Sequence, residues 1–186
     1  MSLRILFEQL RDIRSDVRIP LILMGYLNPI MKFGFEAFCQ KCVECGIDGV
    51  IIPDLPFKDY EETYKPIADR YDIRVIMLIT PETSEARVRE IDEHTDGFIY
   101  MVSSAATTGA QKDFDSQKQA YFKKIQDMHL RNPRMVGFGI SNKQTFDAAC
   151  ANSSGAIIGS RFVTLLNEAE GDAEKAITQL KEGLKK

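Results

Sequence analysis

Two short apolar segments of this chain each end in glycine followed by a small polar stretch, and they constrain the fold more than any other feature. The first is Arg134–Ser141, which reads RMVGFGIS, and the second is Gly155–Ser160, which reads GAIIGS. Each precedes a helix-like segment, so each predicts a strand that passes through a glycine turn into a helix. Free backbone N–H groups and the positive end of a helix dipole attract anions at such a turn. Two of these turns side by side predict a pocket for a phosphate.

Strand-like and helix-like segments alternate along the whole chain. The predicted strands are continuous apolar runs, which is typical of parallel strands covered on both faces; they are Ile19–Met24, Gly49–Ile52, Arg74–Ile79, Gly97–Val102, Met135–Phe138 and Ala156–Ile158. A turn is expected at Tyr26–Pro29. The predicted helices are Leu3–Asp16, Gly34–Cys45, Tyr64–Tyr71, a segment from Ser84 to His94, Gln117–Leu130, Lys143–Ala151 and Ala173–Leu184. Repeated βαβ units form either an open doubly wound sheet or a closed barrel.

The position of the glycine turns favours the barrel. A dinucleotide-binding sheet would need a third glycine where Asn142 stands, and the motif would lie near its first strand. In eight-stranded α/β barrels, the loops after strands seven and eight hold the phosphate. We therefore predict the α/β class and the (β/α)8 TIM-barrel family. Six strands in 186 residues, where roughly 250 residues are typical, predict an incomplete barrel with strands three to eight. Residues 1–186 would form one domain that lacks two βα units at its N-terminal end.

Composition excludes several classes of protein. The net charge is −3, so we expect no nucleic-acid partner and no membrane partner. No apolar run reaches the roughly 20 residues of a transmembrane helix, and the N-terminus does not resemble a signal peptide; we expect a cytoplasmic protein. Cys39, Cys42 and Cys45 have a spacing known from iron–sulfur proteins. Because three cysteines so spaced on one helix fan over a wide arc, we expect packed thiols and no metal site.

Several motifs together resemble the tryptophan synthase alpha-chain family, and the resemblance covers nearly the whole chain. Gly-Phe-Gly-Ile-Ser is moderately specific, and the order and spacing of all the motifs are strong. These motifs are Leu23–Pro29 with Phe33–Gly34, Gly46–Val50 with Pro53–Pro56, Tyr100 before Thr108–Ala110, Gly137–Ser141 and Gly155–Ser160. The family is a barrel that cleaves indole-3-glycerol phosphate to indole and glyceraldehyde 3-phosphate. Its partner, the beta chain, carries pyridoxal phosphate and joins the indole to serine, so the resemblance implies no cofactor in this chain.

The resemblance also implies roles for individual residues. The phosphate would be bound by backbone N–H groups and one hydroxyl, from Gly109, Gly139, Gly159 and Ser160. The indole and glycerol would lie among Met24, Tyr100, Phe138 and Ile157. The beta chain would face Asn28, Asp54 and Pro56. Thr108 would position the catalytic aspartate of the family. Shortly before the Thr–Gly pair, the family usually has arginine and glycine where this chain has Ser104 and Ala106, which puts closure of that loop in doubt.

The two catalytic acids of the family are expected to be missing. The glutamate lies on barrel strand two and the aspartate follows it, in the part that this chain is predicted to lack. Cleavage of the carbon–carbon bond needs paired acids to protonate the indole ring and to stabilise its nitrogen. Only Asp54 and Glu82 lie near a C-terminal strand end. Asp54 matches the partner-facing loop, and Glu82 suits the N-terminus of a helix. We therefore expect this polypeptide to be inactive alone, with Tyr100 and Thr108 as supporting residues.

Two other functions remain open from the sequence. One is another phosphate-binding barrel of the same pathway, which would be expected to carry lysine and glutamate at inward strand ends. The other is a non-catalytic fragment that binds only ligand or the beta chain. A six-stranded piece would also leave the edges of Leu21–Met24 and Ala156–Ile158 open. Because unpaired strand edges recruit other chains, we expect self-association through these edges.

Overall fold

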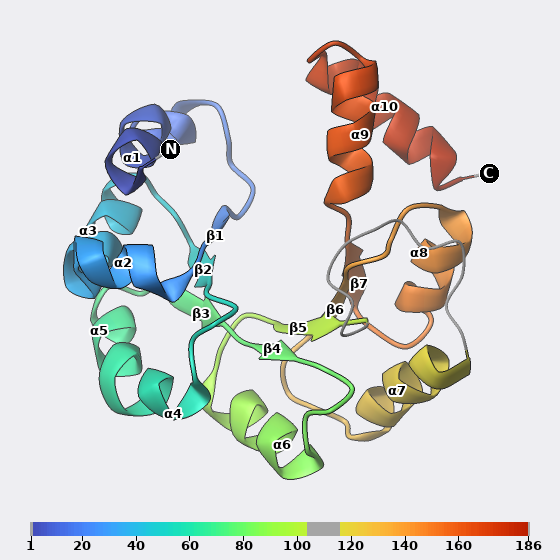
Figure 1. Cartoon of the computed structure of the whole chain (residues 1–186), viewed down its shortest axis with the longest axis horizontal. Helices are drawn as coiled ribbons and strands as arrows, with labels where there is room; N and C mark the ends of the chain where they lie inside the picture. The colour runs from blue at the N-terminus through green and yellow to red at the C-terminus, as the bar shows by residue number, and fades with distance from the viewer. Residues whose placement is uncertain (1, 104–115, 186) are drawn as a thin grey trace. The chain divides into compact units, whose positions relative to one another are not determined.

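The computed structural model describes residues 2–103 and 116–185 as an α/β chain in two compact units. The first unit runs to Met77 and includes Glu90–Gly97, and the second comprises Leu78–Arg89 and the residues from Phe98 onward. Figure 1 shows the order of the elements along the chain. Each unit contains one parallel sheet, and helices connect the successive strands.

The first unit is organised around a three-stranded sheet in the order β1-β2-β3. Its strands are β1 (Ile22–Met24), β2 (Gly49–Ile51) and β3 (Arg74–Ile76). The register pairs Leu23 with Val50 and Val50 with Val75. The helical segments are α1 (Leu3–Leu10), a 3-10 turn (Ile13–Ser15), α2 (Leu27–Phe33), α3 (Phe35–Glu44), α4 (Phe57–Asp59), a π-helical turn (Tyr60–Tyr64) and α5 (Lys65–Arg70).

The second unit is organised around a four-stranded sheet in the order β4-β5-β6-β7. Its strands are β4 (Leu78–Ile79), β5 (Ile99–Val102), β6 (Arg134–Gly137) and β7 (Gly155–Ile157). All of them are parallel, so their carboxyl ends share one edge of the sheet. The helices are α6 (Glu85–His94), which continues into the first unit, α7 (Ser116–Asp127), α8 (Lys143–Cys150), α9 (Ser160–Glu168) and α10 (Ala173–Gly183).

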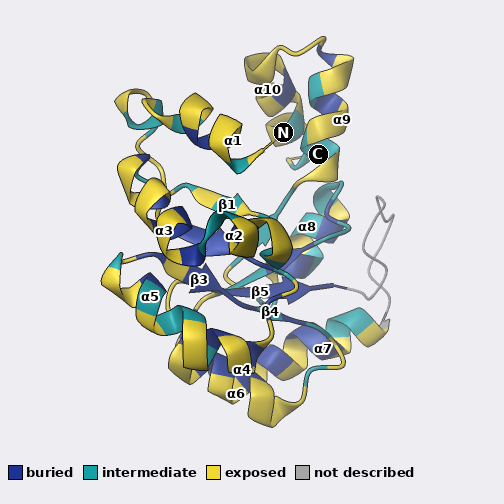
Figure 2. Ribbon diagram, turned by 60° about the vertical axis from the view of Figure 1, so that its left-hand side comes forward, coloured by how far each residue is buried: buried dark blue, intermediate teal, exposed yellow. Residues whose placement is uncertain are grey.

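Burial follows the position of each strand in its sheet. Every residue of β2 and of β5 is buried, as predicted for parallel strands covered on both faces. The strands β1 and β7 are exposed or half-buried, and in the described chain each has a strand neighbour on one side only. Figure 2 shows this contrast between the yellow and teal β1 and the dark-blue β5. The largest fully buried side chains include Phe38, Val50 and Ile76 in the first unit, and Phe122, Ile99 and Met101 in the second.

One predicted strand is divided in the structure. The expected strand Arg74–Ile79 appears as β3 and β4, which pair with β2 and β5 respectively, and Met77 between them belongs to neither strand. Six strands were predicted and the described residues contain seven, because the two halves of this one segment bond to different neighbours.

The helix boundaries also differ from the prediction. The segment predicted as a turn at Tyr26–Pro29 is the start of α2, with Pro29 in its first turn, where proline replaces an N–H that has no helical acceptor. The prediction of one helix over Leu3–Asp16 was wrong, since α1 ends at Leu10 and a separate 3-10 turn follows. The helix expected to start at Tyr64 is preceded by helical turns from Phe57. A helix was expected after the turn at Gly159, but the bounds of α9 were not predicted. In the part of the chain that is described, no helix is long and apolar enough to span a bilayer.

Candidate functional site at the ends of β6 and β7

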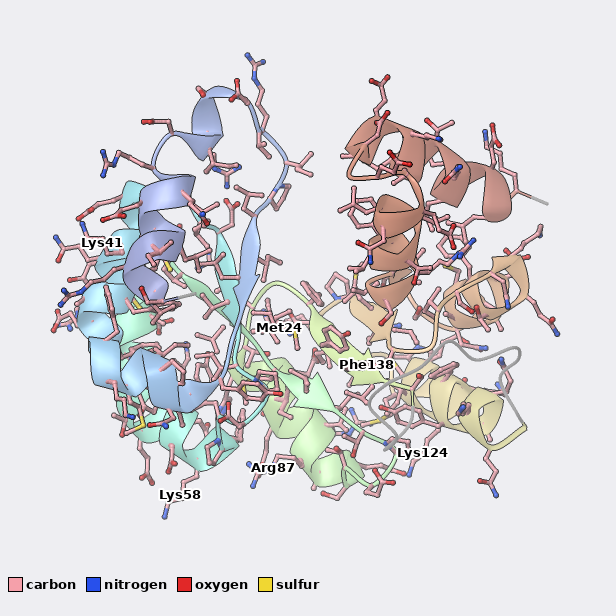
Figure 3. All side chains as sticks on the ribbon, turned by 45° about the horizontal axis from the view of Figure 1, so that its top comes forward. Met24, Lys41, Lys58, Arg87, Lys124 and Phe138 are labelled. Atoms are coloured by element: carbon pink, nitrogen blue, oxygen red, sulfur yellow. The ribbon has the colours of Figure 1, made fainter. Side chains whose placement is uncertain are left out.

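The turn after β6 has an unusual backbone. Phe138 has φ +66° and Gly139 has φ +78°, so two successive residues lie in the left-handed region. Glycine adopts this region freely, but a residue with a bulky side chain seldom does, and such residues cluster at functional sites. Phe138 is half-buried at the end of β6 (Figure 3). Among the described residues, the backbone N–H of Gly139 has no hydrogen-bond acceptor.

Gly137 has a different role, which is to leave room for an aromatic ring. A Cβ atom at this position would lie 2.0 Å from the hydroxyl oxygen of Tyr100. Tyr100 therefore packs across the backbone of β6, and its ring centroid lies 5.7 Å from that of Phe138 with the planes inclined by 52°. The sequence motif suggested a turn glycine here, and the close approach of Tyr100 explains why the side chain must be absent.

Tyr100 is buried, with an exposed fraction of 5%. This desolvation raises the pKa of Tyr100 to about 12, so its hydroxyl is neutral at physiological pH. No hydrogen-bond partner for this hydroxyl occurs among residues 2–103 and 116–185. A neutral phenol can donate a hydrogen bond to a substrate but cannot act as a general base near pH 7.

The N-terminus of α9 offers free donors. Gly159 is the N-cap residue, has no side chain to accept a hydrogen bond, and a Cβ there would meet no atom within 4 Å. The first backbone hydrogen bond of the helix joins the N–H of Val163 to the carbonyl of the N-cap Gly159 at 3.1 Å. In the described parts of the chain, the N–H groups of Ser160, Arg161 and Phe162 have no acceptor. The Ser160 side chain is exposed.

The register of the sheet places the two turns beside each other. Gly137 on β6 pairs with Ile157 on β7, so Gly139 and Gly159 each lie two residues beyond a paired position at the same edge. Neighbouring strands run about 4.8 Å apart. The sheet thus brings together the turn at Gly139, the start of α9 and the aromatic pair Tyr100–Phe138. Ile157 is half-buried on β7 at this edge.

By contrast, helix α8 after the first turn supplies its own acceptor. The side chain of Asn142 accepts a hydrogen bond from the Thr145 N–H at 2.9 Å, and the Thr145 hydroxyl accepts one from the Asn142 N–H at 3.3 Å. This capping box provides acceptors for backbone N–H groups that would otherwise be free. The start of α9 is therefore the better anion site of the two helix ends. Sequence reasoning did not single out this difference, although the Asn-x-x-Thr pattern could have indicated it.

Two predicted site residues, Thr108 and Gly109, lie outside the described residues, as do Ser104 and Ala106. Met24 belongs to the first unit, where its side chain is 53% exposed on β1 (Figure 3). It lines a cavity of about 1060 Å³ with Phe7, Leu23, Ile30 and Phe38, all of the same unit. The structure therefore groups Tyr100, Phe138, Gly139, Ile157, Gly159 and Ser160 within one unit, and it describes Met24 in the other.

The residues predicted to face a partner chain are all exposed. Asn28 lies in the first turn of α2, and Asp54 and Pro56 follow β2. A carboxylate oxygen of Asp54 accepts a hydrogen bond from the Leu27 N–H at 2.8 Å. This bond joins the start of α2 to the loop after β2, so Asn28 and Asp54 lie on neighbouring segments of the first unit.

Several acids of the second unit pair with lysines at helix surfaces. Glu85 pairs with Lys124 at 3.0 Å, Asp127 with Lys123 at 3.2 Å and Asp147 with Lys143 at 2.5 Å. Glu82 is exposed, and its backbone N–H donates to the Thr80 hydroxyl at 3.3 Å. None of these contacts brings a carboxylate to the turn at Gly139.

The three cysteines of α3 and its C-cap are packed into the first unit. Cys39 and Cys42 are fully buried, and Cys45 is 5% exposed. Desolvation raises the pKa of the Cys39 thiol to about 11 and raises that of Cys42 further. Within the described ranges, no group of three His, Cys, Asp or Glu side chains could hold a metal ion.

Comparisons with known proteins identify relatives over almost the whole chain. The family model described as "Tryptophan synthase alpha chain" matches residues 1–186. A protein of Bacteroides fragilis with that name is 80% identical over 181 residues, which are 97% of this chain and 68% of the relative. The protein of the same name from Bacteroides thetaiotaomicron is 78% identical over 185 residues, which are 100% of this chain and 72% of the relative.

Solved structures agree with these relatives. The tryptophan synthase A-subunit of Pyrococcus furiosus superposes with a TM-score of 0.85 at 27% identity, over 99% of this chain and 74% of that chain. A chain of the tryptophan synthase complex of the same organism gives a TM-score of 0.83 at 26% identity, over 99% and 73% respectively. These neighbours are TIM barrels, so the predicted fold class, a partial (β/α)8 barrel, is confirmed. This chain belongs to the tryptophan synthase alpha-chain family, the carbon–carbon lyases of tryptophan biosynthesis that release indole from indole-3-glycerol phosphate.

Proposed function

We propose that the edge formed by β6 and β7 binds the phosphate of indole-3-glycerol phosphate. The observation that carries this proposal is the pair of free donor groups at neighbouring strand ends. The Gly139 N–H lies in a left-handed turn, and the first three N–H groups of α9 have no acceptor in the described chain. The positive end of the α9 dipole adds to the attraction for a dianion. Gly139, Gly159 and Ser160 would bind the phosphate oxygens, together with Gly109.

The aromatic pair beside these donors suits the other end of the substrate. Tyr100 and Phe138 present ring faces with centroids 5.7 Å apart, and indole is a flat aromatic group that packs on such rings. Ile157, which is half-buried on β7 of the same unit, would complete the apolar lining. The Tyr100 hydroxyl, being neutral and without a described partner, would donate a hydrogen bond to the glycerol part of the substrate.

We propose further that a polypeptide of these 186 residues binds substrate without cleaving it. Cleavage needs one acid to protonate the indole ring and one carboxylate at its nitrogen. Asp54 is engaged with the Leu27 N–H, and the acids described in the second unit pair with lysines or lie at helix ends. Thr108 would support an aspartate supplied by another part of the family's barrel. No cofactor of its own would be needed.

The experiment is a binding titration combined with an assay of product. We expect calorimetry to give saturable binding of indole-3-glycerol phosphate to the 186-residue chain, and chromatography to detect no indole. The assay is then repeated with the beta chain added, and we still expect no indole. Failure to bind substrate would contradict the phosphate site, whereas measurable indole formation would contradict the loss of the catalytic acids.

The partner of this chain would be the tryptophan synthase beta chain. One solved neighbour is described as part of the tryptophan synthase complex of Pyrococcus furiosus. The exposed Asn28 lies at the start of α2, and the exposed Asp54 and Pro56 follow β2. The Asp54–Leu27 bond joins these two segments, which suits one continuous contact surface. Surface plasmon resonance with immobilised beta chain tests this surface, since Asn28→Ala and Pro56→Ala should weaken capture. Equal capture by these variants and the wild type would contradict it.

The open edge of β1 supports self-association as a competing interaction. Leu23 bonds to β2, so Ile22 and Met24 direct their backbone groups to the other side, where no described residue pairs with them. Their side chains are 37% and 53% exposed. Such an apolar edge attracts a further strand, here from a second copy. We expect light scattering to report a dimer, and a monomer at all concentrations would contradict this expectation.

The cellular location would be the cytoplasm. All four cysteines lie within the described residues and none forms a disulfide, which is usual for proteins of a reducing compartment.

A further inference from the structure

Ser103 contacts the turn after β6 at two points. The residue follows β5 and its exposed fraction is 0%. Its hydroxyl donates a hydrogen bond to the Phe138 carbonyl at 2.6 Å, and its backbone N–H donates to the Gly137 carbonyl at 3.2 Å. One residue of the neighbouring strand thus binds both carbonyls at the start of the turn.

The bond to Phe138 fixes the peptide group that contains the Gly139 N–H. A trans peptide is planar, and its C=O and N–H groups point in opposite directions. With the Phe138 carbonyl held toward Ser103, the Gly139 N–H must point away from Ser103. The same bond polarises this peptide group and makes its N–H a slightly better donor.

This peptide needs such a restraint because its conformation is costly. Phe138 at φ +66° lies in a region that non-glycine residues avoid, at a cost of about 1–3 kcal/mol. Gly139 at φ +78° follows it, and glycine has a wide choice of other conformations. Without the serine hydroxyl, nothing in the described chain bonds to the Phe138 carbonyl.

We propose that Ser103 is a positioning residue, whose hydroxyl orients the Phe138–Gly139 peptide so that the Gly139 N–H donates to the substrate phosphate. This inference rests on the phosphate site proposed above and adds a residue from a third strand to it. Ser103 itself touches neither the phosphate nor the reacting atoms. Its effect is to keep one donor in place before the anion arrives, which lowers the cost of ordering the site on binding.

The test is a phosphate titration of the full 186-residue chain, followed by ¹H–¹⁵N spectra. Inorganic phosphate should shift the amide signals of Gly139 and of Ser160–Phe162 in the wild type, with a saturable curve. Ser103→Ala should weaken phosphate binding roughly three- to tenfold, as expected for one lost neutral hydrogen bond. The Gly139 signal should also lose most of its phosphate-dependent shift, whereas the α9 signals should still respond at higher concentration.

Two further variants separate orientation from packing. Ser103→Cys keeps nearly the same volume but has only a weak donor, so it should bind phosphate as weakly as Ser103→Ala. Ser153→Ala is the matched control, because the Ser153 hydroxyl also contacts backbone carbonyls, those of Ala149 at 2.7 Å and Gly155 at 2.9 Å, at the other end of β7. This variant should bind phosphate within twofold of the wild type.

The outcomes distinguish this inference from the phosphate site itself. A wild type that shows no saturable shift at Gly139 and at the α9 amides overturns both proposals. If the wild type binds phosphate and Ser103→Ala binds equally well, the role of Ser103 is overturned and the phosphate site stands. If Ser103→Cys restores binding that Ser103→Ala loses, the side chain acts through its volume, and the orienting hydrogen bond is overturned.

Discussion

The starts of α2 and α9 occupy equivalent positions, each directly after an end strand of its sheet. They differ in whether their N-terminal N–H groups have a hydrogen-bond acceptor. In the first unit, the carboxylate of Asp54 reaches across from the loop after β2 and accepts the Leu27 N–H of α2. In the second unit, the N-cap of α9 is Gly159, and no described side chain accepts from Ser160, Arg161 or Phe162. A side chain of the protein therefore accepts from the start of α2, whereas the N–H groups at the start of α9 remain available to an anion.

The contrast shows how to recognise a binding site for an anion in a parallel sheet. Every helix that follows a strand has free donors and a positive dipole end, so these features alone do not distinguish a site. What distinguishes α9 from α2 and α8 is the missing acceptor, together with open space where a Gly159 side chain would lie. The capping box of α8 shows the usual alternative within the same unit.

The largest expected effect comes from giving α9 an acceptor of its own. Gly159→Asp should weaken inorganic phosphate binding by at least about a hundredfold. The new carboxylate takes the N-terminal donors, and like charges 4 Å apart repel by about 4 kcal/mol at an effective dielectric constant of about 20. The substitution should also stabilise α9 by roughly 0.3 kcal/mol, because aspartate is a slightly better N-cap than glycine. Calorimetric titration with phosphate and thermal unfolding measure the two effects.

Gly183→Asp is the matched control for that variant. A Cβ at Gly183 also meets no atom within 4 Å, but this glycine is the last residue of α10 and not an N-cap. It should leave phosphate affinity unchanged. If Gly159→Asp binds phosphate as tightly as the wild type, the difference between the two helix starts has no functional meaning.

A smaller effect is expected when the acceptor of α2 is removed. Asp54→Ala should lower the local stability of α2 by about 1 kcal/mol, because the Leu27 N–H loses its partner. Hydrogen exchange of the α2 amides, followed by NMR, reports this change, and phosphate affinity should not alter. Asp54→Asn retains a carbonyl oxygen and should recover at least half of the protection. Equal protection in Asp54→Ala and the wild type would show that α2 does not depend on this bond.

The smallest effect concerns Asp48, a second carboxylate that holds backbone of the first unit. Its Oδ2 accepts from the Leu21 N–H at 2.7 Å and contacts the Arg14 guanidinium. The Leu21 hydrogen bond, followed by Arg14, lowers the pKa of Asp48 below its usual range. A lowered pKa in the folded state means that the stabilisation is fully present above the unfolded-state pKa of about 3.9 and is lost as pH falls through the folded-state pKa.

Urea unfolding at several pH values tests this prediction. The wild type should exceed Asp48→Asn by less than about 1 kcal/mol at pH 7, since the Asp48 side chain is 51% exposed and solvent weakens the contact. The difference should begin to shrink as pH falls below the unfolded-state pKa of about 3.9, and it should be lost as pH falls through the lower folded-state pKa. Asp72→Asn is the control, because the Asp72 side chain is 84% exposed and forms an ion pair with the Arg74 side chain. A similar pH dependence in this variant would contradict the assignment to Asp48.

Much of the site was open to prediction because it depends on local sequence. The glycine turns, the aromatic Phe138 between Gly137 and Gly139, and the order of strands along the chain all follow from apolar runs and turn residues within a few positions of one another. Gly139 was predicted as a hydrogen-bond donor, and in the structure it lies in a left-handed turn. The contribution of Gly137 to the packing of Tyr100 was not predicted, because it depends on a neighbouring strand 37 residues away in the chain.

The sequence by itself determined the alternation of strands and helices, the buried inner strands and the two turns that end in glycine, since periodicity and turn chemistry act over a few residues. Only the tertiary structure decided which helix start keeps its donors free. Asp54 reaches Leu27 from 27 residues away, and Ser103 reaches Phe138 from 35 residues away. These contacts arise because parallel strands bring distant loops to one edge, and no local pattern in the chain specifies which side chain will be there to accept or to donate.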